Sequence, residues 1–218
     1  TLDGGDDAFR GRRIIRLDDL LPTTSPAPTA PSLDEPPPPR PVGYVWLDPA
    51  VAKSLAARLA ASIGVLEPNW REPTVERLRA FDASIDAVVA EASSATAPST
   101  SASAPPVFLS LDPGYNAFAA AFGFEPIDLL TSGAVALPIN RVDARELLAA
   151  AEKHGVGVLF IPVETPPGLV RDLENALGKS LDIETLDAFG SSAARGRSTY
   201  VELLRYNLSQ LQKALLTP

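Results

Sequence analysis

The feature that most constrains the fold is an alternation of strand-like and helix-like segments in the second half of the chain. Four short runs rich in apolar residues are typical of buried strands, at residues 107–111, 127–130, 156–161 and 183–186. Strands that alternate with helices form a parallel sheet, because each helix carries the chain back to the edge where the previous strand began. We therefore expect residues 107–218 to form an α/β lobe in which helices flank a parallel sheet.

Apolar residues at helical spacing occupy the intervals between and after these strands, at residues 115–122, 144–154, 169–177 and 199–216. Asp143 stands three residues before Glu146, as in a capping box, at the start of the second helix. Gly155 and Gly178 follow the second and third helices, where a glycine commonly ends a helix. These start and stop signals support the helix bounds independently of the strand pattern.

Two segments of biased composition divide the rest of the chain. Residues 1–43 hold a cluster of nine prolines, which predicts an extended arm with one short strand at 13–17. Residues 92–106 consist only of Ala, Ser, Thr and Pro, and this composition predicts a surface loop because it buries little apolar area.

Residues 44–91, between these two segments, are predicted to contain two helices. The first begins at Asp48-Pro49, an N-cap followed by proline, and ends near Gly64. The second covers residues 73–91 and carries charges on most of its faces, so we expect it to be exposed along much of its length.

Charge and residue types exclude several classes of function. The 27 acidic residues outnumber the 19 basic ones, giving a formal charge of −8, so the basic face that nucleic-acid binding needs is missing. The absence of Cys removes thiolate sites, and a single histidine, His154, removes any site that needs two imidazoles. His154 is expected to complement the dipole in the last turn of its helix. With no source for a nucleophile, a base and an orienting residue, we do not expect an enzyme.

The chain begins at Thr1, contains no Met, and has no apolar run close to the about 20 residues of a membrane span. We therefore expect a processed product without a transmembrane segment of its own. Any association with a membrane is then expected to go through a partner.

Five motifs follow one another between Tyr44 and Leu216. The first is Tyr-Val-Trp-Leu-Asp-Pro at residues 44–49, which leads into a helix. The other four lie at residues 112–124, 158–161, 186–187 and 200–208. In this order and spacing they resemble the solute-binding proteins of zinc and manganese ABC transporters (cluster A-I), which write the first motif as His-Val-Trp-Leu-Asp-Pro.

The resemblance implies two α/β lobes joined by a long helix, with a divalent metal held between the lobes by histidines and a carboxylate. It implies a binding protein of the periplasm, the cell surface or an organelle lumen. Only 43 residues precede Tyr44, fewer than the family's first lobe needs. On this basis residues 44–91 would be a remnant of the first lobe with the connecting helix, and residues 107–218 would be the second lobe.

The family's metal ligands carry over only in part. By the resemblance, the histidine of the first motif falls on Tyr44, and the histidine that opens the next helix falls on Asp112. The ligand after the third strand falls on Pro162, with Glu164 two residues further on, and a late aspartate is retained as Asp187. Asp112, Glu164 and Asp187 are therefore the candidate metal ligands, an oxygen-only set that suits a hard cation such as Mn²⁺, Ca²⁺ or Mg²⁺ better than Zn²⁺.

Each candidate also has an ordinary structural role. Asp112 would cap the helix that follows it, Glu164 would lie on a solvated loop, and Asp187 would form a turn at the end of a strand. Tyr44 would pack beside Trp46, because a phenol with a pKa of about 10 is a poor ligand.

Two functions remain open. In the first, the chain is a degenerate solute-binding-protein-like module that has lost its metal site and has no cofactor. It would serve as an accessory or structural subunit of a larger assembly, docking a protein partner through the Pro-rich arm and the faces of the lobe. In the alternative, the chain is an extracytoplasmic receptor of an ABC transporter that binds one divalent metal, Mn or Zn.

Overall fold

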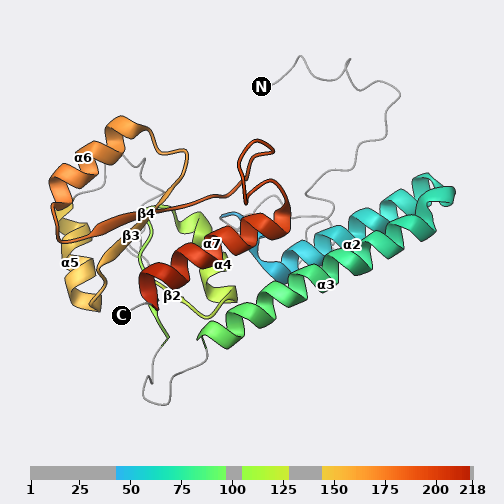
Figure 1. Cartoon of the computed structure of the whole chain (residues 1–218), viewed down its shortest axis with the longest axis horizontal. Coiled ribbons are helices and arrows are strands. Elements are labelled where there is room, and N and C mark those ends of the chain that lie inside the picture. The colour runs from blue at the N-terminus through green and yellow to red at the C-terminus, as the bar shows by residue number, and fades with distance from the viewer. Residues whose placement is uncertain (1–42, 97–104, 128–143, 217–218) are drawn as a thin grey trace, which may run out of the picture. The chain divides into compact units, whose positions relative to one another are not determined.

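The computed structural model describes residues 43–96, 105–127 and 144–216, which Figure 1 traces in colour. The chain divides into two compact units. The first includes Ala50–Ala83, and the second contains Arg40–Pro49 and Ser84–Pro218. The strand expected at residues 13–17 lies outside the described residues. The domain boundaries expected after residues 43, 91 and 106 stay a prediction.

The first unit is built from one helix and the first part of the next, which continues into the second unit after Ala83. Helix α2 spans Pro49–Leu66, the 3₁₀ helix η3 spans Pro68–Trp70, and α3 begins directly at Arg71. Helix α2 starts at the proline that the sequence indicated and continues two residues past Gly64. Gly64 is buried, and a methyl group on it would meet the Arg71 side chain at 3.4 Å, so a small residue allows the two helices to approach.

Helix α3 spans Arg71–Thr96 and is longer than predicted at both ends. Its last five residues come from the Ala- and Ser-rich segment that was expected to be a loop, so that expectation is wrong for residues 92–96. Alanine has the highest helix propensity, and Ala92 is only 2% exposed, which together explain why the helix continues.

Helix α2 meets the length and composition expected of a membrane span. Over its 18 residues the mean hydropathy is 1.3, and 17% of the segment is buried. By length and composition alone, one helix of the described residues could therefore span a membrane, contrary to the expectation that no such segment exists. Lys53 and Arg58 place two positive charges within the segment.

The second unit contains short parallel strands. Strand β1 (Val107–Phe108) pairs with β2 (Glu125–Pro126), and β3 (Val158–Pro162) pairs with β4 (Asp182–Leu186). A parallel bridge between Ser110 and Phe160 joins the two pairs in the order β2, β1, β3, β4. This confirms the predicted α/β class with parallel strands.

The strands differ from the prediction mainly in their bounds. The run at 107–111 forms two residues of strand followed by the bridge, where Leu111 donates to the Phe160 carbonyl at 3.0 Å and Phe160 donates to the Leu109 carbonyl at 2.9 Å. Of the run at 127–130, Ile127 donates from its backbone to Phe108 at 2.7 Å, and the rest lies outside the described residues.

Helices follow the strands as expected. They are η4 (Pro113–Tyr115) and α4 (Asn116–Ala121) after β1, α5 (Ala144–His154) before β3, α6 (Pro167–Leu177) after β3, and α7 (Tyr200–Leu215) after β4. Gly155 and Gly178 adopt φ angles of +66° and +62°, the left-handed turn that ends α5 and α6. At the start of α7, Thr199 and Glu202 form a complete capping box. Asp143, the expected cap of α5, lies outside the described residues.

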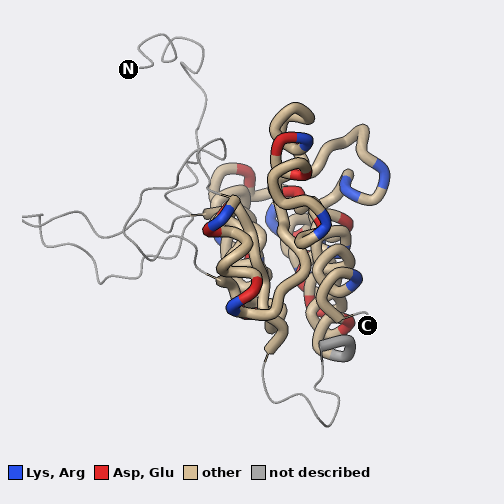
Figure 2. Tube along the Cα trace, turned by 90° about the vertical axis from the view of Figure 1, so that its left-hand side faces the viewer, with Lys and Arg blue, Asp and Glu red and all other residues tan. Residues whose placement is uncertain are grey.

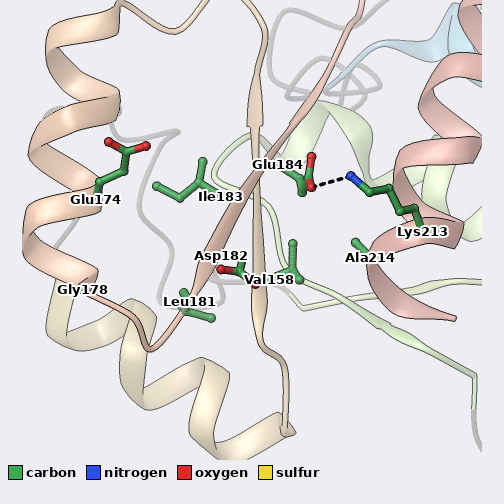
Figure 3. Close-up of a pocket in the computed structure, with 9 residues that line it drawn as sticks. All are labelled: Val158, Glu174, Gly178, Leu181, Asp182, Ile183, Glu184, Lys213 and Ala214. Carbon is green, nitrogen blue, oxygen red and sulfur yellow. Dashed lines mark hydrogen bonds and ion pairs between the residues drawn. The ribbon is translucent and has the colours of Figure 1, made fainter. Parts of the chain in front are cut away.

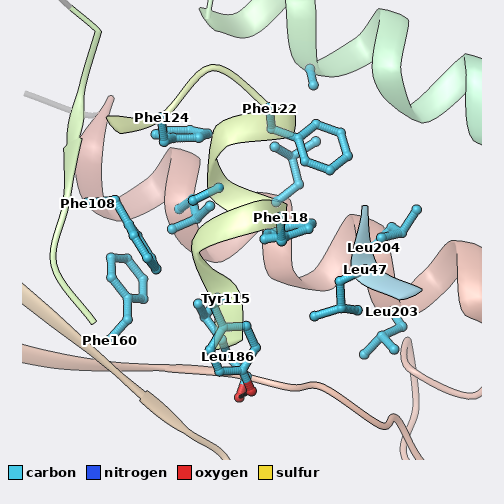
Figure 4. Packing of buried hydrophobic residues seen from close by; sticks show 14 of the residues in the cluster. Leu47, Phe108, Tyr115, Phe118, Phe122, Phe124, Phe160, Leu186, Leu203 and Leu204 are labelled. Carbon is cyan, nitrogen blue, oxygen red and sulfur yellow. Dashed lines mark hydrogen bonds between the residues drawn. The ribbon is translucent and has the colours of Figure 1, made fainter. Parts of the chain in front are cut away.

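The sheet separates two hydrophobic layers, as the alternation of side chains along its strands requires. Leu109, Leu159 and Ile161 face α5 and α6, in a cluster of mostly aliphatic residues. Phe108 and Phe160 face α4 and α7, and their rings stack at a centroid distance of 5.3 Å (Figure 4). Figure 1 shows α5 and α6 on one side of β3 and β4, with α4 and α7 on the other.

Candidate functional site

The carboxyl ends of the parallel strands bring the three predicted site residues to one edge of the sheet. Asp112 follows the bridge after β1, Glu164 lies two residues after β3, and Asp187 directly follows β4. Loops at this edge are the usual ligand position in open α/β sheets. The predicted location of these residues at strand ends is therefore observed.

Asp112 has two partners within the chain. Its Oδ1 accepts a hydrogen bond from the backbone of Gly114 at 2.8 Å and so caps η4, and its Oδ2 accepts one from the Tyr44 hydroxyl at 2.7 Å. The Tyr44 backbone also donates to the Gly114 carbonyl at 3.0 Å. A methyl group on Gly114 would lie 2.8 Å from ring carbons of Tyr44, so only glycine permits this contact. Asp112 therefore has the helix-capping role that was expected of it as the alternative to metal binding.

Asp187 is the most deeply buried of the three carboxylates. Its residue is 3% exposed, and its Oδ1 accepts hydrogen bonds from the backbones of Phe189 (2.9 Å) and Gly190 (2.8 Å). Its Oδ2 accepts from the Arg197 guanidinium at 2.7 Å. The carboxylate thus organises the turn after β4, as its structural alternative predicted, and forms an ion pair that the sequence did not indicate.

The backbone of Asp187 is held by a residue from α7. Asn207, which is fully buried, accepts a hydrogen bond from the Asp187 backbone N–H at 2.8 Å and donates one to its carbonyl at 2.7 Å. One amide side chain therefore satisfies both backbone groups where β4 ends. The sequence placed Asn207 in the terminal-helix motif but did not reveal this contact.

Glu164 differs from the two aspartates because it is exposed. No hydrogen bond to it is formed by the described residues. Its charge nevertheless reaches the buried tyrosines, since it contributes to raising the pKa of both Tyr44 and Tyr115. Glu164 lies on the solvated loop that the structural alternative predicted.

Two tyrosines lie among these carboxylates. Burial is the main cause that raises the pKa of the Tyr115 phenol, and the charges of Glu164, Asp112 and Asp187 raise it further. Burial also raises the pKa of Tyr44, together with its hydrogen bond to Asp112. Both phenols are therefore neutral donors, and neither is poised to act as an anionic ligand. This agrees with the expectation that Tyr44 has a packing role.

Aromatic rings surround Tyr44. Its ring lies 5.5 Å from Trp46, 4.9 Å from Tyr115 and 5.5 Å from Phe189, measured between centroids. Trp46 donates from its indole N–H to the Ala188 carbonyl at 2.8 Å and so joins the first motif to the turn after β4. Phe189 is 65% exposed despite this packing. The sequence motif located Trp46, but no periodicity indicated that Phe189 would join it.

The three carboxylates do not form a coordination site in this arrangement. Within residues 43–96, 105–127 and 144–216, no group of three His, Cys, Asp or Glu side chains is placed to hold a metal ion. Pro162 is buried at the end of β3, and His154 is exposed in the last turn of α5, the position from which it was expected to complement the helix dipole. As they stand, the residues do not fit a divalent metal, because Asp112 and Asp187 already have internal partners.

A pocket of about 520 Å³ lies at the opposite, amino end of β3 and β4 (Figure 3). Its wall includes Glu184 of β4 and Lys213 of α7, which form an ion pair at 3.3 Å. This end of a parallel sheet is not where α/β proteins usually bind ligands. The pocket therefore does not overlap the candidate site.

Charges of both signs are interspersed along the described helices (Figure 2). Arg205 of α7, for example, pairs with Glu91 of α3 at 3.0 Å.

The fold is similar to that of several solved bacterial proteins. The periplasmic zinc binding protein TroA from Treponema pallidum matches with a TM-score of 0.68 at 19% identity, over 96% of this chain and 74% of that one. The laminin-binding protein Lbp of Streptococcus pyogenes matches with a TM-score of 0.63 at 20% identity, over 79% of this chain and 63% of that one.

Comparisons of sequence agree. The high-affinity zinc uptake system protein ZnuA of Brucella abortus is 22% identical over 172 residues, which are 79% of this chain and 49% of that protein. ZnuA of Haemophilus influenzae is 20% identical over the same shares. The chain thus spans about half the length of the curated relatives it matches.

The family described as "Zinc-uptake complex component A periplasmic" matches residues 41–214. This range contains all five motifs on which the resemblance was based. The match also agrees with the expectation of a binding protein and not an enzyme. The chain therefore belongs to the ZnuA family of zinc-uptake solute-binding proteins.

Proposed function

We propose that this chain is an extracytoplasmic binding component of a zinc- or manganese-uptake system. The observation that carries the proposal is the family match over residues 41–214. Its expected location is the periplasm or the cell surface, and its expected partners are the membrane components of an ABC transporter.

The lobe built around β1 to β4 is, on this proposal, the second lobe of a solute-binding protein. The order of its motifs and its parallel sheet support this assignment. Helix α3 would be the connecting helix, and α2 would be what the described residues retain of the first lobe. Residues 1–43 would then be an arm available for docking.

In the receptor form of the proposal, a divalent cation is the substrate and Asp112, Glu164 and Asp187 are its protein ligands. Carboxylate oxygens suit Mn²⁺ in ligand type. Glu164 is exposed and available, whereas Asp112 must release Tyr44 and Asp187 must release Arg197 before either coordinates a metal. Metal binding by this route is expected to be weaker than at a preformed site.

A second candidate function is favoured by those same internal bonds. If Asp112 and Asp187 keep their partners, the lobe needs no metal to hold its edge together. The chain would then act as an accessory or structural subunit that docks onto other proteins. Its scaffold contacts, such as Trp46 to Ala188, would serve packing alone.

The two roles predict different states of the purified protein. Protein purified without chelator is examined by native mass spectrometry and elemental analysis. The receptor role is supported if the free chain carries one equivalent of Mn or Zn and Asp187→Ala lowers the affinity for that metal about tenfold. A metal-free chain that copurifies stoichiometrically with other subunits supports the structural role. Metal binding unaffected by Asp187→Ala would contradict the proposed ligand set.

A further inference from the structure

The Asp187 carboxylate is a buried anion whose hydrogen-bonding capacity is largely used. Three N–H groups donate to it, two from the backbone turn and one from Arg197. Its side chain is only 4% exposed, so water contributes little to its solvation. A buried carboxylate needs a cation close by to remain charged at low cost.

Arg197 meets that need from the loop between β4 and α7. Its guanidinium lies 2.7 Å from the Asp187 oxygen and stacks over the Tyr206 ring, with 4.8 Å between the guanidinium carbon and the ring centroid. Its side chain is 25% exposed, so the group is held against the protein on most sides. Both contacts fix the plane of the guanidinium, which is the geometry that arginine provides and lysine does not.

The loop itself delivers Arg197 to this position. The Ser191 backbone donates to the Arg197 carbonyl at 3.1 Å, and the Arg197 backbone donates to the Ala194 carbonyl at 3.1 Å. Gly190 has φ = +63°, and a methyl group on it would lie 2.5 Å from the Arg197 carbonyl oxygen. The close return of the chain therefore requires glycine, and it places the arginine beside the carboxylate that begins the turn.

The rest of the edge is negative. Asp112 follows the bridge after β1 and Glu164 follows β3, so this edge holds two further acidic side chains. Within the described residues, the only ion pair formed by any of these three carboxylates is the one between Asp187 and Arg197. Arg197 therefore neutralises the Asp187 carboxylate at this edge.

We propose that Arg197 is the resident cation of the candidate site, holding Asp187 where a divalent metal would otherwise bind. The inference rests on the proposed function only in treating Asp187 as the family's metal-ligand position. A metal must displace the guanidinium to reach the Oδ2 atom of Asp187.

The test compares Arg197→Gln with Arg195→Gln, a matched control two residues away whose side chain is exposed. Each full-length protein, freed of metal, is unfolded by heat with and without MnCl₂ or ZnCl₂, and each metal is titrated by calorimetry. Circular dichroism verifies that each variant is folded. Arg197→Lys keeps the charge and serves as a second variant if Arg197→Gln does not fold.

We expect Arg197→Gln to lower the unfolding midpoint by about 4 °C or more, and added metal to restore part of the loss. Its affinity for metal is expected to exceed that of the natural chain by about tenfold, since a competing charge has been removed. Arg195→Gln should match the natural chain in both measurements. Arg197→Lys should bind metal no better than the natural chain.

Two results would overturn the inference. One is an Arg197→Gln protein whose unfolding midpoint and metal affinity equal those of Arg195→Gln. The other is Arg197→Lys with a gain in metal affinity as large as that of Arg197→Gln. The receptor role is tested separately by the titration of the natural chain, because that titration does not depend on the difference between the variants.

Discussion

Helices α2 and α7 are similar in length but differ in how much of their apolar surface is covered. In α7, Leu203, Leu204, Leu208 and Leu211 are buried against the sheet and α4. In α2, the side chain of Leu59 is 41% exposed and that of Val65 is 72% exposed. Yet α2 is the more apolar helix by sequence, with a mean hydropathy high enough for a membrane span.

The comparison shows that apolar content and burial are separate properties. The apolar residues of α7 form one stripe that matches a sheet face, and its other faces carry polar residues. Those of α2 are spread around the helix, so no single partner surface would cover them. Trp70 and Val75, in the same unit, are also exposed, at 56% and 39%. Stability should therefore depend far more on α7 than on α2.

The largest difference is expected for a matched pair of leucine truncations. Leu204→Ala in α7 removes a fully buried side chain and should lower the free energy of unfolding by about 2 to 5 kcal/mol. Leu59→Ala in α2 should cost less than about 1 kcal/mol, since much of its side chain is already in water. Urea unfolding monitored by circular dichroism measures both. Equal losses would show that α2 is covered in solution.

A smaller difference is expected for a pair of asparagine truncations. Asn207→Ala leaves the buried N–H and carbonyl of Asp187 without their partners, at a cost of about 1 to 3 kcal/mol for each group left unsatisfied. Asn69→Ala, at an exposed position of η3, should change stability by about 0.5 kcal/mol or less. The same urea titration compares them. A neutral Asn207→Ala would mean that water replaces both bonds.

The stability of the second unit should depend on pH in the alkaline range, because Tyr44, Tyr115 and Tyr200 all belong to this unit. Burial is the main cause that raises the pKa of each phenol above its ordinary value. The unfolded chain therefore loses these protons first, and stability should fall as the pH rises through about 10. Absorbance of phenolate at 295 nm should rise together with unfolding. Full ionisation of these tyrosines in a folded protein would contradict the burial.

The smallest effect is expected at the capping box of α7. Thr199→Ala removes the acceptor for the Glu202 backbone N–H and should cost about 1 kcal/mol. Thr74→Ala, in the first unit, lacks a cap bond among the described contacts and should be close to neutral. Thermal unfolding of both variants makes the comparison. An equal loss of stability for Thr74→Ala would show that the capping bond of Thr199 is not the cause of the difference.

The Glu202 carboxylate of the same capping box should make the stability of the chain depend on pH in the acid range. Hydrogen bonds from Ser198 and Thr199 lower the pKa of the Glu202 carboxyl below its ordinary value. A lowered pKa stabilises the folded chain above the unfolded value, and this contribution is lost as the pH falls through the folded value. Glu202→Gln should therefore flatten the acid limb of stability below about pH 4. An unchanged acid limb would show that this carboxylate is not held in solution.

Part of the candidate site was predictable because it follows from the order of strands. Asp112, Glu164 and Asp187 come after strand-like runs, and parallel strands end on one edge, so their common location required no tertiary information. Their partners were not predictable. Tyr44 reaches Asp112 from 68 residues away, and Asn207 reaches Asp187 from 20 residues away in a different element.

By itself, the sequence determined the α/β class, the bounds of α5 and the family, because these depend on local periodicity, capping residues and short motifs. Only the tertiary structure decided that α3 continues to Thr96, since burial of Ala92 overrides a loop-like composition. It also decided that Asp187 pairs with Arg197. Long-range pairing depends on how a loop folds back in space, and that is set by packing and not by any spacing along the chain.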